Sequence, residues 1–200
     1  MVTNGKLERL PAKIVLLKTD EALPKFFAPD ELNRIFSRVN DAKMKATLRV
    51  LAGTGLRRSE LYRCSLENGY LHLRQTKGRK DRLVALPSDL IPDFLLATDN
   101  PYQPNTVTHA FARAIRNAGI EPKGRSLHSL RYTFALQEYY RTGDIYYVKG
   151  LLGHSAVSVT ERYLQFPQEY LERVFGRHVI RRTTAEYISE LTDRKPPFNA

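Results

Sequence analysis

Hydrophobic residues recur at helical spacing over most of the chain. Met44, Leu48 and Leu51, for example, fall on one face of a helix for which Asp41 supplies an N-cap. Similar spacing, with capping side chains before it and glycines after it, predicts further helices. These cover residues 29–38, 59–61, 106–117, 127–141, 145–152, 156–164, 168–175 and 184–191, and another begins near residue 88. The chain is therefore predicted to be mostly helical.

Single residues set several of these helix boundaries. Gly53 and Gly55 are expected to end the helix that contains Met44. Ser88 is expected to cap a helix that is kept short by an interior proline, Pro92. In the same way, Asn105 is expected to cap the helix that starts at the next residue.

One region alternates between polar and apolar residues instead. Asn68 and Gly69 are typical of a tight turn, and residues 70–75 then alternate as a strand does. Residues 82–86 return as a second strand after a basic tip at residues 76–81. The predicted fold class is α+β, mostly helical, with a small antiparallel β-sheet.

The composition favours a polyanionic partner. The 200 residues are 42% hydrophobic, which suffices for one domain with a real core. The net charge of +11 points to a nucleic acid or an acidic membrane, although a basic protein kept soluble by its charge would look the same. Cys64 is the only cysteine, so neither a disulfide framework nor a cysteine cluster for zinc is expected. No apolar run approaches the ~20 residues of a membrane span, and a cytosolic protein is expected.

Four side chains of the C-terminal half are predicted to meet in one pocket. With Ser126 as N-cap, His128 and Arg131 stand one turn apart on the same face of a helix. His154 lies in the turn after the helix over residues 145–152, and Tyr163 follows about two turns into the next helix. An arginine, two histidines and a tyrosine at these positions point to a phosphate site.

These residues also match a known family. The sequence HSLR, followed by LLGH and a tyrosine nine residues after that histidine, resembles the C-terminal signature of the tyrosine recombinases, or phage integrases. Upstream, LAGTGLRRSEL resembles the first-arginine box of the family and places that arginine at Arg57. The sequence TKGRKDRLVALP resembles the lysine hairpin of the family and places the catalytic lysine at Lys77. The fold implied is a tyrosine-recombinase-like catalytic domain.

The resemblance implies a role for each matched residue in breaking and rejoining DNA strands. Arg57 and Arg131 would offer planar forks of donors to the phosphate oxygens, and Glu60 would support the first-arginine box. Tyr163 would attack phosphorus and leave a 3′-phosphotyrosyl bond and a free 5′-hydroxyl, with His128 accepting or relaying its proton.

Two further groups complete the implied site. Lys77 would protonate the departing 5′ oxygen, and His154 would hydrogen-bond a phosphate oxygen. No ATP-binding loop of the G-x-x-x-x-G-K-[ST] type occurs in the sequence, and the resemblance implies neither a metal ion nor a cofactor. Two alternatives stay open: a type IB topoisomerase with similar chemistry, and a noncatalytic DNA-binding regulator that kept the fold.

The resemblance also implies an organisation and partners. Residues 1–27 read as a linker or lead-in, residues 28–166 as the catalytic domain, and residues 167–200 as a helical tail that neighbouring protomers could exchange. The expected partners are double-stranded DNA and further copies of the chain, in a dimer or tetramer on that DNA, and no membrane. An integrase of a phage or mobile element would act in the cytoplasm, in association with the nucleoid.

Overall fold

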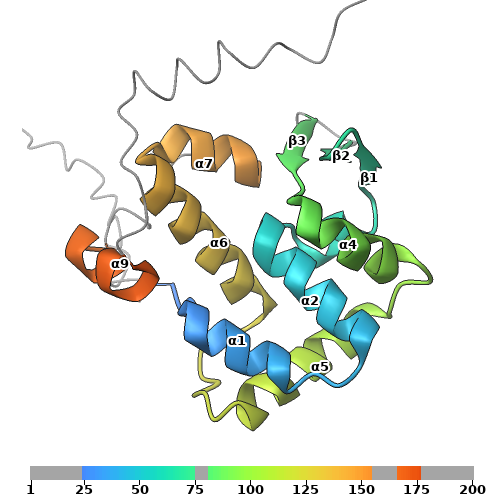
Figure 1. Cartoon of the computed structure of the whole chain (residues 1–200), viewed down its shortest axis with the longest axis horizontal. Coiled ribbons are helices and arrows are strands. Elements are labelled where there is room, and N and C mark those ends of the chain that lie inside the picture. The colour runs from blue at the N-terminus through green and yellow to red at the C-terminus, as the bar shows by residue number, and fades with distance from the viewer. Residues whose placement is uncertain (1–23, 75–80, 155–165, 177–200) are drawn as a thin grey trace, which may run out of the picture.

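The computed structural model describes residues 24–74, 81–154 and 166–176 of the chain. Helices surround a central helix, α2, and a small sheet lies at one end of the assembly (Figure 1). The helices are α1 (Pro29–Ser37), α2 (Ala42–Thr54), α3 (Arg58–Leu61), α4 (Ile91–Thr98), α5 (Pro104–Asn117), α6 (Leu127–Thr142), α7 (Ile145–Leu152) and α9 (Gln168–Phe175), with a 3-10 turn, η1 (Ser88–Leu90), before α4. The strands are β1 (Ser65–Glu67), β2 (Tyr70–Leu73) and β3 (Arg82–Ala85). The α+β, mostly helical fold class is therefore confirmed.

Local caps start the helices that carry most of the structure. The Asp41 carboxylate accepts a hydrogen bond from the Met44 N–H at 2.8 Å, which starts α2. Ser126 and Asp144 cap α6 and α7 in the same way, because their side chains accept from N–H groups in the first turn. These three caps confirm the predicted helix starts.

Three predicted boundaries were wrong. Gly53 lies inside α2, which continues to Thr54 and ends at Gly55. Asn105 lies inside α5, because Pro104 already occupies the first turn, where its missing N–H has no hydrogen bond to lose. Pro92 likewise lies in the first turn of α4 and does not interrupt it, while Ser88 starts the 3-10 turn without a side-chain cap.

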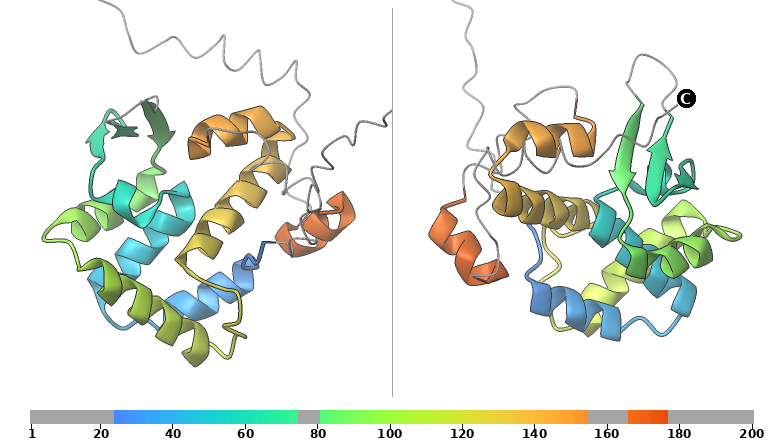
Figure 2. Two further views of the ribbon diagram at one scale, coloured as in Figure 1. Left: turned by 180° about the vertical axis from the view of Figure 1, so that it is seen from behind. Right: turned by 45° about the horizontal axis from the view of Figure 1, so that its top comes forward.

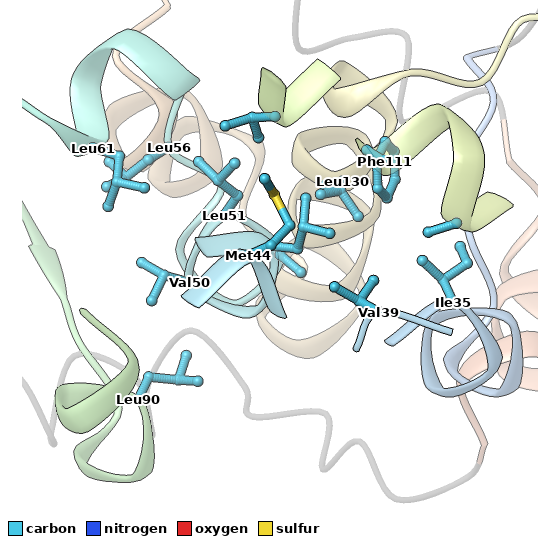
Figure 3. Packing of buried hydrophobic residues seen from close by; sticks show 14 of the residues in the cluster. Ile35, Val39, Met44, Val50, Leu51, Leu56, Leu61, Leu90, Phe111 and Leu130 are labelled. Atoms are coloured by element: carbon cyan, nitrogen blue, oxygen red, sulfur yellow. The ribbon is translucent and has the colours of Figure 1, made fainter. Parts of the chain in front are cut away.

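The main hydrophobic core is centred on α2. This helix packs against α1, α4, α5 and α6, and its apolar residues Met44, Val50 and Leu51 are almost fully buried (Figure 3). Leu130 of α6 and Phe111 of α5 reach the same core from other sides. Because α2 and α6 pack together in this core, the segments that follow α2 and those that begin α6 lie close to each other.

The three strands form one antiparallel sheet in the order β1-β2-β3. Leu71 pairs with Val84 and Leu73 pairs with Arg82, so the predicted hairpin is confirmed. The tip of that hairpin, with Lys77, lies outside the described residues. Strand β3 contacts α7, and the sheet and α7 lie on the same side of the central helices (Figure 2).

A second, smaller cluster joins α6, α7 and α9. Its buried residues include Leu136, Val148 and Leu171, and α9 packs on α6 of its own chain. Phe27 at the end of the lead-in is fully buried and belongs to the main core. The predicted helices over residues 156–164 and 184–191 lie outside the described residues. Within the described ranges, each helix is too short or too polar to cross a lipid bilayer.

Candidate phosphate-binding site

The turn between α2 and α3 presents Arg57. The chain turns at Gly55, whose φ of 63° is in the left-handed region, and a Cβ there would lie 2.3 Å from Cδ1 of Phe134. Arg57 then precedes the first residue of α3. Its N–H donates to Oε2 of Glu60 at 2.8 Å, and its Nη1 donates to Oε1 of the same residue at 2.9 Å. Both ends of Arg57 are thus held by one carboxylate, and 31% of its side chain stays exposed.

Arg131 enters the site from α6 and is almost completely buried. Its side chain is 2% exposed. Nη1 donates to the Gly55 carbonyl at 2.7 Å and lies 3.5 Å from Oε2 of Glu60, while Nη2 donates to the Leu152 carbonyl. One guanidinium group therefore joins the end of α2, helix α3 and the end of α7. These hydrogen bonds offset the free-energy cost of burying the charged guanidinium group.

A third arginine, Arg82, was not predicted to belong to the site. Its Nη2 donates to Oε2 of Glu60 at 2.8 Å, and its Nε donates to the Leu151 carbonyl at 3.1 Å. The position of Arg82 in the predicted hairpin does indicate that its side chain is buried. Arg82 is the partner of the buried Leu73 in the hairpin, and cross-strand partners share a face of the sheet. An arginine at an inward-facing position of a strand indicates a buried ion pair.

The Glu60 carboxylate is the common acceptor of this cluster. Burial alone would raise its pKa, but the N–H of Arg57 and the guanidinium groups of Arg82 and Arg131 outweigh that effect and lower the pKa. Glu60 is therefore ionised at neutral pH. Three arginines around one carboxylate leave two positive charges in excess, which favours an anion at this place.

The two histidines lie within the field of these arginines. Desolvation, and then the charges of Arg131 and Arg57, lower the pKa of His154 to about 4. The same causes, in the same order, lower the pKa of His128, whose ring makes an edge contact with Tyr132 at 4.9 Å between centroids. Both histidines are consequently neutral at pH 7, so each imidazole has one nitrogen that can accept a proton and one that can donate.

The glycine-ended helix α7 places His154. Helix α7 ends at Gly153, whose φ is 65°, and the His154 N–H donates to the Lys149 carbonyl at 3.1 Å. A Cβ at Gly153 would lie 2.6 Å from Nη1 of Arg82. The histidine turn is therefore packed directly on the third arginine.

The structure brings together four of the six predicted site residues: Arg57, His128, Arg131 and His154. Lys77 and Tyr163 lie outside the described residues. Within the described ranges, no three His, Cys, Asp or Glu side chains gather as they would around a metal ion. The excess positive charge of three arginines around Glu60, beside two neutral histidines, suits the binding of a phosphate group.

Comparisons with known proteins point to one family. Residues 90–169 match the sequence model of the phage integrase family. The tyrosine recombinase XerA of Pyrococcus furiosus is 30% identical over 80% of this chain, which spans 64% of that relative's length. The catalytic domain of bacteriophage HP1 integrase has the same fold, with a TM-score of 0.57, 26% identity and coverage of 74% of this chain and 91% of that one. A lambda integrase dimer bound to a COC′ core site aligns with a TM-score of 0.59 and 19% identity over 72% of this chain and 60% of that one. Residues 90–169 therefore match the phage integrase family, and the chain is similar to a tyrosine recombinase over 80% of its length.

Proposed function

We propose that this chain is the catalytic domain of a site-specific DNA recombinase that cuts and rejoins strands through a 3′-phosphotyrosyl intermediate. The observation that carries the proposal is the network in which Arg57 and Arg131, 74 positions apart in the sequence, meet on Glu60. Both arginines were expected from the family resemblance, and the fold brings them to one place. The relatives that match the chain over most of its length are recombinases and integrases.

The positive site suits the chemistry of a phosphodiester. The scissile phosphate carries one negative charge and gains a second as the nucleophile adds to phosphorus. The two excess positive charges around Glu60 match that developing charge. Arg57, with 31% of its side chain exposed, is the arginine that we expect to contact a phosphate oxygen directly. Arg131 is buried. It contributes positive charge to the site, and its hydrogen bonds keep the surrounding segments together.

The remaining roles follow the matched motifs. Tyr163 is the proposed nucleophile, and a neutral His128 can accept its proton during attack. Lys77 is the proposed general acid for the 5′ oxygen, and His154 donates a hydrogen bond to a phosphate oxygen. The phosphotyrosyl bond conserves the energy of the broken phosphodiester, so a 5′-hydroxyl can reseal the strand without ATP.

Double-stranded DNA is the proposed substrate, bound by a dimer or tetramer of the chain. The net charge of +11 supports a polyanionic partner, and the similar lambda integrase is a dimer on its core site. We propose residues 28–166 as the catalytic domain, after a lead-in of residues 1–27 and before a tail of residues 167–200. A protein with this role acts in the cytoplasm, in association with the nucleoid.

A covalent-capture experiment tests the proposal. The probe is a pool of DNA duplexes with a randomised segment and a nick, so that the short 5′-hydroxyl fragment diffuses away after cleavage and the adduct accumulates. The protein is incubated with the pool, and adducts are separated on a denaturing gel and sequenced. The variant Tyr163→Phe is compared with the matched control Tyr146→Phe, because Tyr146 is 70% exposed on α7.

The expected result is an adduct with the natural chain and with Tyr146→Phe, and none with Tyr163→Phe. An adduct that survives Tyr163→Phe would assign the nucleophile elsewhere. Salt-sensitive DNA binding without any adduct would contradict the proposed catalysis and favour a DNA-binding regulator. Relaxation of supercoiled plasmids of unrelated sequence would instead favour the topoisomerase alternative.

A further inference from the structure

The proposed reaction assigns no role to Arg82, although this residue lies at the centre of the site. It starts strand β3, and its side chain is 8% exposed. The guanidinium group donates from Nη2 to Glu60 at 2.8 Å and from Nε to the Leu151 carbonyl at 3.1 Å. Strand β3, helix α3 and the end of α7 therefore meet on one side chain.

We propose that Arg82 is a positioning residue for the phosphate site, which it serves by holding Glu60 and, through Glu60, the two arginines of the proposed reaction. This inference rests on the proposed function. Oε2 of Glu60 accepts from both the Arg57 N–H and Arg82, and it lies 3.5 Å from Nη1 of Arg131. A shift of this one carboxylate moves every arginine that it contacts.

Arg82 changes the charge balance around Glu60. With Arg82 present, the cluster has two positive charges in excess of the carboxylate. Without Arg82 the excess falls to one, and Glu60 keeps more of its attraction for Arg57. The carboxylate would then compete with the phosphate for the exposed arginine. Arg82 thus leaves Arg57 available to the substrate.

Arg82 also supports the turn that carries His154. Nη1 of Arg82 is buried and has no hydrogen-bond partner among the described residues, and it lies 2.6 Å from the position that a Cβ of Gly153 would take. The guanidinium therefore fills the space beneath the turn that leads to His154. A lysine would carry the same charge, but a single ammonium group cannot reproduce the planar fork that serves Glu60 and Leu151 from two sides.

The test uses the full chain and the nicked duplex selected by the natural protein in the capture experiment. The variants are Arg82→Gln, Arg82→Lys, Glu60→Gln and the double variant of Arg82→Gln with Glu60→Gln. The matched control is Arg49→Gln, because Arg49 pairs with Asp93 at 3.2 Å between α2 and α4. Single-turnover adduct formation at saturating DNA, DNA affinity and thermal melting are measured for each variant.

Arg82→Gln is expected to slow adduct formation about 10- to 100-fold, whereas DNA affinity stays within about threefold. Arg82→Lys is expected to remain at least about fivefold slower than the natural chain. The double variant should be no slower than the slower single variant, because both changes break the same interaction. A merely structural role for Arg82 would lower the melting temperature without slowing adduct formation by the folded protein at saturating DNA.

The outcomes separate this inference from the proposed function. If the natural chain forms no adduct, the proposed function fails and this inference fails with it. If the natural chain forms the adduct and Arg82→Gln is as fast as Arg49→Gln, only the inference about Arg82 is wrong. If the two rate reductions multiply in the double variant, the inference is also wrong, because Arg82 would then act independently of Glu60. If Arg82→Gln does not melt cooperatively, and so does not fold, Arg82→Lys replaces it in each comparison. The double variant is then Arg82→Lys with Glu60→Gln.

Discussion

Arg57 and Arg131 are assigned matching roles by the family resemblance, but the protein holds them in opposite ways. Arg57 stands before a four-residue helix, contacts Glu60 and keeps 31% of its side chain exposed. Arg131 lies within a 16-residue helix, is 2% exposed and donates to two backbone carbonyls from other segments. The exposed arginine can meet a substrate without rearrangement, whereas the buried one holds the site together.

The difference shows how one site can combine rigidity with access. A buried cation with fixed partners costs little reorganisation when charge develops nearby, because it already has its final orientation. An exposed cation provides the contact that the substrate makes. Glu60 links the two arginines, so the buried one restrains the exposed one. The predictions below test whether stability and catalysis divide between Arg131 and Arg57 as this comparison implies.

The largest effect is expected at Arg131. The variant Arg131→Met should lower the free energy of unfolding by about 3–5 kcal/mol, because it removes one partner of a buried ion pair and leaves the carbonyls of Gly55 and Leu152 without their donor. Urea denaturation measures the change. Arg49→Met, at a more exposed ion pair, should cost no more than about 1 kcal/mol. Equal losses for the two variants would show that Arg131 has no special structural part.

The opposite pattern is expected at Arg57. The variant Arg57→Lys should change the free energy of unfolding by less than about 1 kcal/mol, since its ion pair with Glu60 is partly exposed. Adduct formation should nevertheless fall about 10²- to 10³-fold, because a lysine cannot present a planar fork to the phosphate. Single-turnover cleavage and urea denaturation are measured on the same preparation. A large stability loss with little loss of cleavage would reverse the comparison between the two arginines.

Gly55 connects the two regions, and its substitution should have an intermediate effect. Its carbonyl accepts from Arg131, and it lies two residues before Arg57. Gly55→Ala places a methyl group 2.3 Å from Cδ1 of Phe134 at a φ of 63°, and should cost about 2–4 kcal/mol. The control is Gly119→Ala, with a φ of 68° and open space around its Cβ, which should cost about 1–2 kcal/mol. Thermal melting of the two variants separates the packing clash from the backbone strain, and equal losses would count against the clash.

Local features of the site were predictable from the sequence because their causes are local. Asp41, Ser126 and Asp144 cap helices through N–H groups only two or three residues ahead, so a short window contains the whole interaction. The ends of α6 and α7 follow in the same way from Gly143 and Gly153. Helix caps and spacing predicted that Arg131 would meet both histidines, and the family resemblance added Arg57. The structure brings these four residues together.

The contacts that determine the burial and the hydrogen-bond partners of each arginine could not be predicted, because they join segments that are distant in the sequence. Arg131 donates to a carbonyl 76 positions away, and no local pattern indicates that its side chain is buried. Arg82 depends on the register of a hairpin, since a shift by one residue would turn it to the other face of the sheet. Asn105 was mistaken for a cap because Pro104 can start a helix one position earlier.

The smallest predicted effect concerns His154, and it tests whether the arginines keep this histidine neutral. Its folded-state pKa of about 4 lies below the ordinary 6.5, so the unfolded chain binds more protons between these values and stability falls as pH drops from 6.5 towards 4. Glu60, whose pKa is lowered from 4.5, loses its contribution only below that value. Between pH 7 and pH 5, the free energy of unfolding of the natural chain should therefore fall by about 1 kcal/mol more than that of His154→Gln in urea denaturation.

The variant Arg57→Gln should raise the pKa of His154, measured from its ring proton shifts, because it removes a nearby positive charge. An unchanged pKa would mean that the exposed arginine acts on the substrate without influencing the histidine, and that desolvation and the buried arginines keep His154 neutral.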